Sequence, residues 1–468
     1  MDKRIRKSIS TTITVVIIVV IIVIAAGVGV YLATTSKTTT TSTTSTSSVT
    51  TAATSCNTSS STFCFPAKPK GSNATLSGTV TIGVMTDTTD GLSSIGIPIG
   101  YATQLAAGDI NTWLAGTQWA GKVTFKVDIL NYALENSEAA TDLSAFASDG
   151  ITVVVGPLNS GTVGAIYSTA QSDNIVLISP SSTSVLLAGV SNYLYRTVPN
   201  DAFQAQADSQ EMYQDGVRNL IIVYTNQAYG SGLANATSSL FKAKGGNVTA
   251  MIPYTPSTTS FGPTLASMNS AWSTAVANAG GNTSAVAFQV IGYQEVGSLL
   301  QQASTSYPSL LNSTQPWYGT DGESDNVAFT NTTFASYSLT ARLPSTFYET
   351  TNTSATGRVC AAIDTNTSGG CDPYTLNAYD DTWLAADALM QCGANSGTCL
   401  ASRAVAQVAN ESVGVTGAMT LGSDHDRIGN AYVIYDIQSI SGTITWVIAG
   451  NWTVATDMVT WNQYKPKF

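Results

Sequence analysis

Residues 151–166 read ITVVVGPLNSGTVGAI, which is a short apolar run, a Gly-Pro turn and a set of small polar residues leading into a helix-like segment. The same plan returns at residues 175–190, IVLISPSSTSVLLAGV, where hydroxyl side chains fill the turn. Continuous apolar runs of this length are typical of strands that are covered on both faces of a parallel sheet. The two stretches therefore predict neighbouring strand-to-helix units of an α/β fold.

Similar units recur from residue 78 onward. The further strands that the pattern predicts are 79–85, 123–129, 220–224 and 285–291. Apolar residues at helical spacing predict helices at 101–114 and 137–148. With 468 residues, of which 43% are apolar and 10% charged, the chain is long enough for two lobes with a core each. The sequence therefore predicts a two-lobed α/β protein with parallel sheets.

The charge of the chain argues against nucleic acid as a partner. The sequence has 29 acidic and 19 basic residues, and one of the acids and seven of the bases precede residue 78. The remaining body holds 29 − 1 = 28 acids and 19 − 7 = 12 bases. A body of this charge repels phosphates, so no nucleic acid is expected to bind.

The N-terminal region predicts a membrane anchor. Residues 13–33 form an uncharged run of 21 residues, long enough to span a bilayer, and a basic cluster precedes it at 1–12. This charge bias places the N-terminus in the cytoplasm and the body outside the cell, at the cell membrane. Two alternatives stay open: a signal peptide that is removed, and cleavage after the basic cluster, as in pilin-like precursors, which would leave the apolar helix for assembly.

Residues 34–77 predict a stalk. Their first part, 34–55, is almost entirely Ser, Thr and Ala, and it has too little apolar content to build a core. Dense Ser and Thr suit O-glycosylation, and Asn-x-Ser/Thr sequons occur throughout the body. The chain is therefore expected to be an exported glycoprotein.

The six cysteines fall into three pairs of close neighbours. They are Cys56 with Cys64, Cys360 with Cys371, and Cys392 with Cys399. Local disulfides are the natural interpretation outside a cell, although six cysteines allow 15 pairings and the sequence does not choose among them. No Cys-x-x-Cys occurs and His425 is the single histidine, so no metal site is expected.

Polar residues follow the two predicted strands at 151–156 and 175–179. Ser160 stands where a helix N-cap belongs, and Ser181, Ser182 and Thr183 fill the second turn. In an open parallel sheet, ligands bind beyond the carboxyl ends of the strands, where backbone N–H groups and the helix dipole favour an anion. Ordinary capping is the alternative for either turn alone. Together the two turns predict uncharged hydrogen-bond donors that converge on one binding site.

These motifs resemble the branched-chain amino acid (leucine/isoleucine/valine) solute-binding proteins of ABC transporters, which are type I periplasmic binding proteins. The resemblance covers residues 78 to about 450, and ten segments carry it in order and spacing: VTIGVMTDTTDG, VVVGPLNSGTVGAI, NIVLISPSSTS, YLYRTVPND, LIIVYTNQAYGSGLA, TSFGPTLASM, VIGYQEVGSLLQQA, WYGTDG, AYDDTWLAADAL and GVTGAMTLGSDHDR. It implies two α/β lobes, a Venus flytrap, joined by a three-stranded hinge. Lobe 1 would take 78–200 and 347–418, and lobe 2 would take 201–346 and 419–465.

The resemblance also implies roles for single residues in the first lobe. Ser160 falls on the serine that holds the α-carboxylate of the ligand. Thr183 falls on the threonine that binds both the carboxylate and the ammonium group. Ser181 would offer its backbone carbonyl to the ammonium. The aromatic residue that often follows the first strand in this family is not evident here, so side-chain specificity does not transfer.

The second lobe would complete the site. Tyr229 and Tyr293 fall on tyrosines that line the cleft, and Asp321 falls where the family carries an acid that pairs with the ammonium. That acid is usually a glutamate, and aspartate is one methylene shorter. The resemblance therefore implies a site for a small zwitterion.

The function expected from these observations is a membrane-tethered solute-binding protein that hands an amino acid, or a similar small polar metabolite, to an ABC transporter permease. A non-transport surface receptor, an adhesion protein or a filament component with the same fold is the alternative. An enzyme is not expected, because the chain has no Gly-x-Ser-x-Gly elbow and no P-loop. No cofactor is expected. An anchored stalk without a lipobox cysteine is more typical of archaea than of bacteria.

Overall fold

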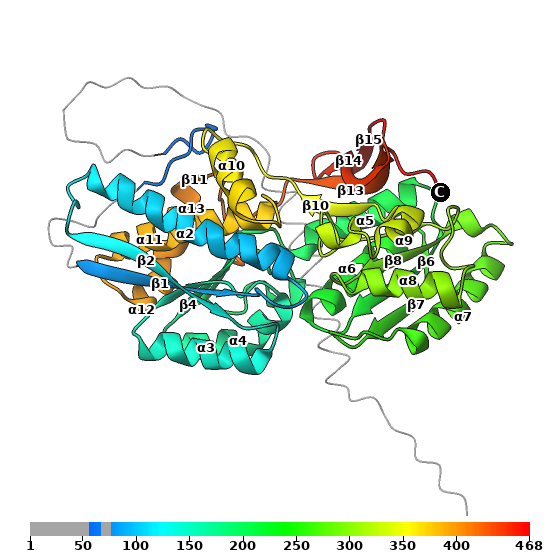
Figure 1. The fold of residues 1–468 in the computed structure, drawn as a ribbon, viewed down its shortest axis with the longest axis horizontal. Coiled ribbons are helices and arrows are strands. Elements are labelled where there is room, and N and C mark those ends of the chain that lie inside the picture. The colour runs from blue at the N-terminus through cyan, green and yellow to red at the C-terminus, as the bar shows by residue number, and fades with distance from the viewer. Residues whose placement is uncertain (1–55, 67–75) are drawn as a thin grey trace, which may run out of the picture. The chain divides into compact units, whose positions relative to one another are not determined.

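The computed structural model describes residues 56–66 and 76–468, and Figure 1 shows their fold. The predicted cytoplasmic segment and membrane span lie outside these residues, as does most of the predicted stalk. None of the helices within the described ranges has both the length and the apolar character that crossing a membrane requires. The anchor therefore stays a prediction.

The first lobe is built on a parallel sheet of five strands in the order β2-β1-β3-β4-β5. Its strands are β1 (Gly78–Thr86), β2 (Val123–Asn131), β3 (Val153–Val155), β4 (Val176–Ser179) and β5 (Leu194–Arg196). Its main helices are α2 (Ser93–Ala115), α3 (Asn136–Ser148), α4 (Ser160–Ser172) and α11 (Pro373–Cys392). α2 packs against α11, and α3 packs against α4 below the sheet in Figure 1. The predicted parallel sheet is confirmed.

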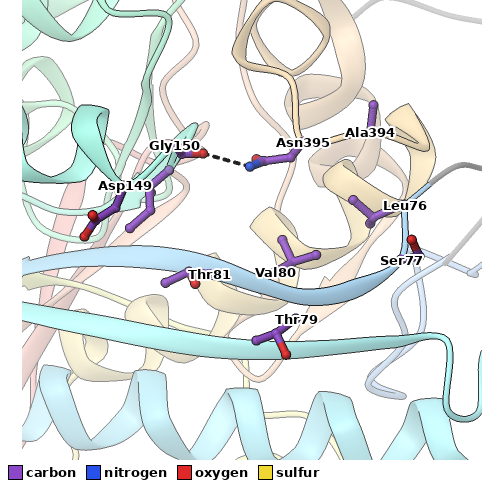
Figure 2. Close-up of a pocket in the computed structure, with 10 residues that line it drawn as sticks. Leu76, Ser77, Thr79, Val80, Thr81, Asp149, Gly150, Ala394 and Asn395 are labelled. Atoms are coloured by element: carbon purple, nitrogen blue, oxygen red, sulfur yellow. Dashed lines mark hydrogen bonds between the residues drawn. The ribbon is translucent and has the colours of Figure 1, made fainter.

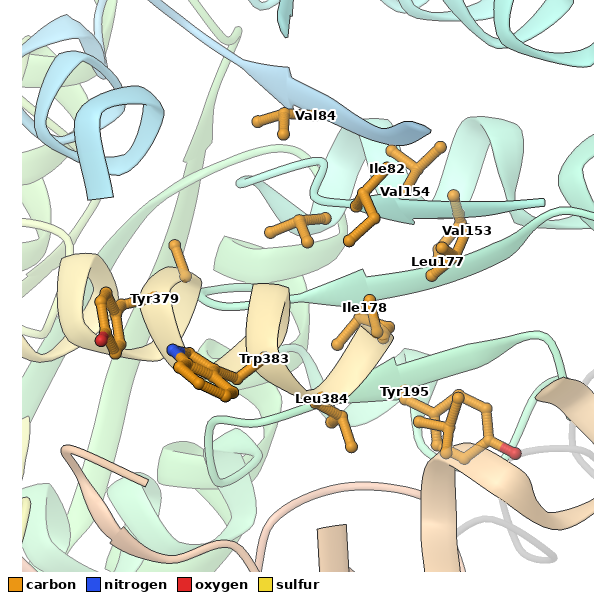
Figure 3. Close-up of a cluster of buried hydrophobic side chains, with 14 of the residues drawn as sticks. Ile82, Val84, Val153, Val154, Leu177, Ile178, Tyr195, Tyr379, Trp383 and Leu384 are labelled. Carbon is orange, nitrogen blue, oxygen red and sulfur yellow. The ribbon is translucent and has the colours of Figure 1, made fainter. Parts of the chain in front are cut away.

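The core of the first lobe lies between the sheet and α11. Ile82, Val154 and Ile178 come from three adjacent strands and are fully buried, and Figure 3 shows them together with Leu384 of α11. Each such side chain contributes roughly 1.5–3 kcal/mol on burial. α11 is buried from its second residue to Met390. These contacts fix the carboxyl ends of β3 and β4 relative to each other.

The second lobe is built on a parallel sheet in the order β7-β6-β8-β9. Its strands are β6 (Asn219–Thr225), β7 (Asn247–Tyr254), β8 (Val286–Ile291) and β9 (Trp317–Tyr318). Its helices are α5 (Asp201–Gln214), α6 (Ala228–Ala243), α7 (Gly262–Asn278), α8 (Val296–Ser306) and α9 (Ala335–Ala341). It has hydrophobic clusters of its own, in which Phe288 and Leu220 are fully buried. The expectation of two cores is therefore confirmed.

A third sheet is antiparallel, in the order β10-β13-β14-β15. Its strands are β10 (Ser345–Tyr348), β13 (Ala431–Ile440), β14 (Thr443–Thr453) and β15 (Met458–Trp461). The shorter elements of the C-terminal part of the chain are α10 (Thr356–Asn366), α12 (Gly397–Cys399), α13 (Val405–Glu411), β11 (Val413–Gly414) and β12 (Gly417–Ala418), of which α10 and α13 contact α11 of the first lobe. Isolated bridges join Gly319 to Ser345 and Arg196 to Asp426. The bridge from Gly319 to Ser345 connects this sheet to the second lobe. The bridge from Arg196 to Asp426 connects β5 to the segment that precedes β13.

The predicted strands and helices match the observed ones within about two residues, apart from the start of α2. α2 begins at Ser93, eight residues before the predicted start at residue 101. Gly96 explains the difference, because a Cβ atom there would lie 1.8 Å from the carbonyl oxygen of Asp87. Glycine allows this close approach, so residues 93–100 pack as the first turns of α2. The spacing of their apolar residues does not indicate a helix, so the sequence does not predict these turns.

Three disulfides join the cysteines that are neighbours in the sequence. They are Cys56–Cys64, Cys360–Cys371 and Cys392–Cys399. The first closes a loop that docks on the first lobe. Cys64 and Val413 exchange backbone hydrogen bonds of 2.8 Å, and the ring of Phe63 meets the edge of Trp383 of α11 with centroids 5.4 Å apart.

Candidate functional site

A cavity of about 30 Å³ lies at the carboxyl ends of the strands of both lobes. Six of the seven residues predicted to bind a ligand line it: Ser160, Ser181, Thr183, Tyr229, Tyr293 and Asp321. The seventh, Ser182, is fully buried and donates a hydrogen bond of 3.1 Å from its hydroxyl to the hydroxyl of Ser160. The lining extends in sequence from Leu92 to Tyr374, so segments far apart in the chain meet at one place.

The hydroxyl of Ser160 is held in one orientation. It accepts hydrogen bonds from the hydroxyl of Ser182 at 3.1 Å and from the backbone N–H of Ser184 at 3.2 Å. Both acceptor positions of a serine hydroxyl are then filled, and its own proton is left to donate. A ligand carboxylate is a strong acceptor for such a donor.

The predicted N-cap role of Ser160 is wrong by one position. Ser160 is the first residue of α4, and Asn159, whose backbone is extended, takes the cap position. The backbone carbonyl of Asn159 accepts from the N–H of Val163 at 3.1 Å, which makes Asn159 the boundary of the helix. Its side chain does not cap the helix but accepts a hydrogen bond of 2.8 Å from the hydroxyl of Tyr132.

The second turn is positioned by Arg196 of β5, a residue that the sequence analysis missed. Its guanidinium donates to the carbonyl oxygens of Ser182 at 3.0 Å and Ser184 at 2.7 Å. It also forms a buried ion pair with Asp426, with 2.6 Å between Nε and Oδ1. The charge of Arg196 is thereby neutralised, and the arginine shapes the turn without adding a cation to the cavity.

Asp321 is held by tyrosines from both lobes. The hydroxyl of Tyr229 in α6 donates to its Oδ1 at 2.6 Å, and the hydroxyl of Tyr374 in α11 donates to its Oδ2. Burial raises the pKa of Asp321, and the two tyrosine hydrogen bonds oppose that rise. The rings of Tyr229 and Tyr293 stack with centroids 5.4 Å apart. Tyr374 also lines the cavity and was missed, since its helix lies far from the predicted turns in sequence.

A second acid supports the turn that carries Asp321. Glu323 accepts from the backbone N–H of Thr320 at 2.9 Å and of Gly292 at 2.7 Å. Gly322 is required there, because a Cβ atom would lie 2.0 Å from the carbonyl oxygen of Gly292. Glu323 thus serves the loop, and Asp321 is the acid that faces the cavity.

Part of the remaining wall is apolar, and Asn159 and Gly322 complete it. Leu92, Ile95 and Leu158 form the apolar part, and the first two come from the segment between β1 and the first turn of α2. This segment contains no aromatic residue, as the sequence indicates. In the structure, aliphatic side chains occupy this part of the wall.

The described conformation is closed. A volume of about 30 Å³ holds only one or two water molecules, whereas pockets for small molecules measure roughly 300–1,000 Å³. Contacts such as the 2.6 Å hydrogen bond from the hydroxyl of Ser184 to the carbonyl oxygen of Ala228 join the two lobes. A ligand therefore enters only if the lobes move apart.

A second, larger hollow of about 410 Å³ lies at the opposite end of the first sheet (Figure 2). It is lined mainly by the amino-terminal half of β1 and by the loops around Asp149 and Asn395, which are exposed. Asn395 donates a hydrogen bond of 2.8 Å to the carbonyl oxygen of Gly150. With Asp149 as its sole ionisable lining residue, this hollow has fewer means of recognising a ligand than the smaller cavity has.

The fold and the cavity define a solute-binding protein of the periplasmic type, and comparison with known proteins agrees. The profile of the family described as periplasmic binding protein matches residues 79–439, so the chain belongs to that family. The type I fold is shared with the branched-chain amino acid transporter substrate binding protein LivJ from Streptococcus pneumoniae, solved in complex with isoleucine. That similarity has a TM-score of 0.62 at 22% identity and covers 79% of this chain and 99% of LivJ.

Several relatives are similar in sequence, among them the two that follow. An uncharacterized protein of Methanocaldococcus jannaschii is 27% identical over 399 residues, which is 82% of this chain and 91% of that protein. The chemotactic signal transduction system substrate-binding protein BasB of Halobacterium salinarum is 28% identical over 260 residues, which is 53% of this chain and 55% of BasB. The resemblance inferred from the ten sequence segments is therefore confirmed at the level of the family.

Proposed function

We propose that the protein captures a small amino acid between its two lobes and delivers it to an ABC transporter permease. The observation that carries the proposal is the meeting of hydroxyl donors from two strand-end turns with Asp321 in one closed cavity. The structural similarity to a protein solved with isoleucine supports the same ligand class.

Each end of an α-amino acid finds matching chemistry in the cavity. The carboxylate would accept hydrogen bonds from Ser160 at the start of α4, where the helix dipole favours an anion, and from Thr183 in the turn after β4. The ammonium would contact Asp321 and the carbonyl of Ser181. Charge-assisted hydrogen bonds contribute roughly 1.5–3 kcal/mol each, and micromolar affinity requires about 8 kcal/mol. Four or five such contacts suffice.

The side chain of the ligand would face the apolar wall formed by Leu92, Ile95 and Leu158. Aliphatic lining favours an aliphatic ligand group, because it offers no partner for a polar one. Branched-chain amino acids fit this description best. The described cavity is too small for an amino acid, so the lobes would close less far around a ligand than they do here. Contacts from both lobes would still require closure, so the ligand would shift the equilibrium from the open form to that closed form.

The membrane-tethered arrangement belongs to the same proposal. The run at residues 13–33 would anchor the protein in the cell membrane, and the stalk at 34–77 would hold the body outside the cell. Lobe boundaries near residues 200, 346 and 418 are proposed with it. An archaeal source and glycosylation of the stalk are proposed on the composition of this segment.

Calorimetry on the purified full-length protein tests the ligand class. We expect an amino acid from a panel of the twenty amino acids, short amides, urea and nucleobases to bind with micromolar affinity or better. Binding should weaken at least tenfold in Thr183→Ala and in Asp321→Asn. A folded protein that binds none of these compounds would contradict the proposal.

A second candidate function is a receptor for signalling rather than transport, which the similarity to the chemotactic substrate-binding protein BasB favours. The two functions differ in what the loss of the gene does. Transport predicts that deletion abolishes uptake of the bound amino acid, whereas a receptor role predicts normal uptake and loss of the cellular response to it.

A further inference from the structure

The Cys360–Cys371 disulfide closes residues 360–371 into a loop that packs on the helix carrying the apolar wall of the cavity. Gly369 of this 360–371 loop makes the contact. A Cβ atom on Gly369 would lie 1.8 Å from the carbonyl oxygen of Ser94 and 2.5 Å from Cγ of Pro98, both in the first turns of α2. Only a residue without a side chain allows so close an approach. The 360–371 loop therefore fixes the outer side of these turns.

The end of β1 holds the same turns from another side. The carboxylate of Asp87 accepts a hydrogen bond of 2.8 Å from the backbone N–H of Leu92. The hydroxyl of Thr86 donates to the carbonyl oxygen of Gly96 at 2.7 Å. Leu92 lines the cavity and lies two residues, more than half a helical turn, from Ser94. Pressure on Ser94 therefore acts toward the cavity.

The 360–371 loop also leads directly into α11. Asp372 follows the disulfide and caps this helix, because its carboxylate accepts hydrogen bonds from the backbone N–H of Thr375 at 2.8 Å and from the Thr375 hydroxyl at 3.0 Å. Tyr374, the second residue of α11, lines the cavity and donates a hydrogen bond to Asp321. Two segments of the cavity wall, the first turns of α2 and the start of α11, thus depend on one loop.

The disulfide restricts the movement of the 360–371 loop. It joins Cys360 of α10 to Cys371, and α10 itself contacts both α2 and α11 (Figure 1). Arg358 of α10 also donates to Asp109 of α2 at 2.8 Å. A cross-link between residues 11 apart leaves the chain between them few alternative paths. Gly369 is therefore held against α2 as long as the disulfide is intact.

We propose that Gly369 and the Cys360–Cys371 disulfide are positioning elements that set which aliphatic side chain the cavity accepts. The proposal rests on the proposed function and adds the origin of its specificity. The 360–371 loop fixes where Leu92 and Ile95 stand in the ligand-bound form, and so how much room the side chain of the ligand has. A well-packed apolar wall distinguishes ligands that differ by one methylene by roughly 10- to 200-fold.

The test is a double-mutant cycle in the full-length protein. Gly369→Ala and the paired substitution Cys360→Ser/Cys371→Ser are made separately and together. Calorimetry measures the affinities for L-alanine, L-valine, L-leucine and L-isoleucine, and thermal unfolding shows that each variant is folded. The deciding quantity is the ratio of affinities between the branched-chain amino acids and alanine, because a general loss of stability does not change this ratio.

Two control variants match the two changes. Gly357→Ala adds a methyl group on α10, where a Cβ atom would have no neighbour within 4 Å. Cys392→Ser/Cys399→Ser removes another short disulfide of the first lobe, next to Asn395 at the opposite end of the sheet. Both controls should keep the wild-type ratio within about twofold, since neither touches the first turns of α2.

We expect the wild type to prefer a branched-chain amino acid over alanine by about tenfold or more. Gly369→Ala forces the first turns of α2 toward the cavity, so the affinity for the branched-chain ligands should fall about tenfold more than that for alanine. Without the disulfide the wall is no longer held, and the preference should shrink to about threefold or less. In that background the 360–371 loop yields, so Gly369→Ala should change the ratio little further.

The outcomes that overturn the proposal are distinguishable from a failure of the proposed function. If the wild type binds amino acids without preference, or if Gly369→Ala and the disulfide-free variant keep its preference, the role of the loop is wrong and the proposed function stands. An equal loss for all four ligands also contradicts the role in specificity. Should Gly369→Ala not fold, the disulfide-free variant alone decides. If the wild type binds none of the four, the proposed function fails together with this refinement.

Discussion

Arg196 shows how one residue sets the geometry of the cavity without lining it. Its side chain is fully buried, and its guanidinium donates four hydrogen bonds, two to the carboxylate of Asp426 and one each to the carbonyls of Ser182 and Ser184. A planar guanidinium can serve all these acceptors at once, whereas a lysine ammonium presents a single point charge. The second turn therefore depends on arginine at this position.

We expect Arg196→Lys to lower the free energy of unfolding by about 3 kcal/mol, because it leaves buried acceptors without donors. Urea denaturation measures this. Arg358→Lys is the control, since Arg358 pairs with Asp109 at 2.8 Å but is 55% exposed, and such pairs contribute less than about 1 kcal/mol. Equal losses for the two substitutions would contradict the role given to Arg196.

At the scale of elements, the loop closed by Cys56–Cys64 attaches the start of the described chain to the first lobe. Phe63 and Phe65 pack against Trp383 of α11, and Val413 of β11 pairs with Cys64. α11 also carries Tyr374, which reaches the cavity. The loop thus packs against Trp383 of α11, the helix whose Tyr374 contacts Asp321.

Phe63→Ala should destabilise the protein by about 1–2 kcal/mol through the lost aromatic contacts, and should leave amino-acid affinity within about twofold. Thermal unfolding and calorimetry provide the two readouts. Thr62→Ala changes an exposed neighbour in the same loop and should alter neither. A large loss of affinity in Phe63→Ala would mean that the loop acts on the cavity through α11 rather than only stabilising the lobe.

At the scale of the whole molecule, buried acids far outnumber buried bases. Among the described residues the buried cations are Arg196 and Arg427. The buried carboxylates are Asp87, Asp142, Asp201, Asp208, Glu211, Asp321, Glu323, Asp380, Asp381, Asp387, Asp426 and Asp436. Burial raises the pKa of Asp142 and Asp380 to about 6 and that of Asp436 to about 7. These groups bind protons more tightly in the folded than in the unfolded chain.

The stability of the fold is therefore expected to fall as the pH rises. Between pH 4 and pH 7 the folded state holds more protons than the unfolded state, so stability is highest near pH 4 to 5 and falls as the pH rises through the folded pKa values. We expect the melting temperature to be several degrees lower at pH 8 than at pH 5. Asp436→Asn should reduce this difference in melting temperature between pH 5 and pH 8. Gln438→Ala, which keeps the carboxyl of Asp436, should not reduce it. Stability that rises with pH over this range would contradict the prediction.

Much of the fold was open to prediction because its signals are local. Apolar runs such as 175–179 and the small polar residues after them specify a strand and a turn over a few positions, and the parallel topology brings the ends of β3 and β4 together. Ser160 and Thr183 could therefore be assigned to one place. Asp321 and the two cleft tyrosines were placed by resemblance to a family rather than by local pattern.

The sequence by itself thus determined the α/β class, the two cores, the strand-end turns and the candidate residues on them. The tertiary structure alone decided that Tyr374 meets Asp321, that Arg196 is paired with Asp426 230 residues away, and which cysteines are joined. The physical reason is that strands and turns depend on neighbouring residues, whereas these contacts depend on how the chain crosses between lobes and packs, which no short stretch encodes.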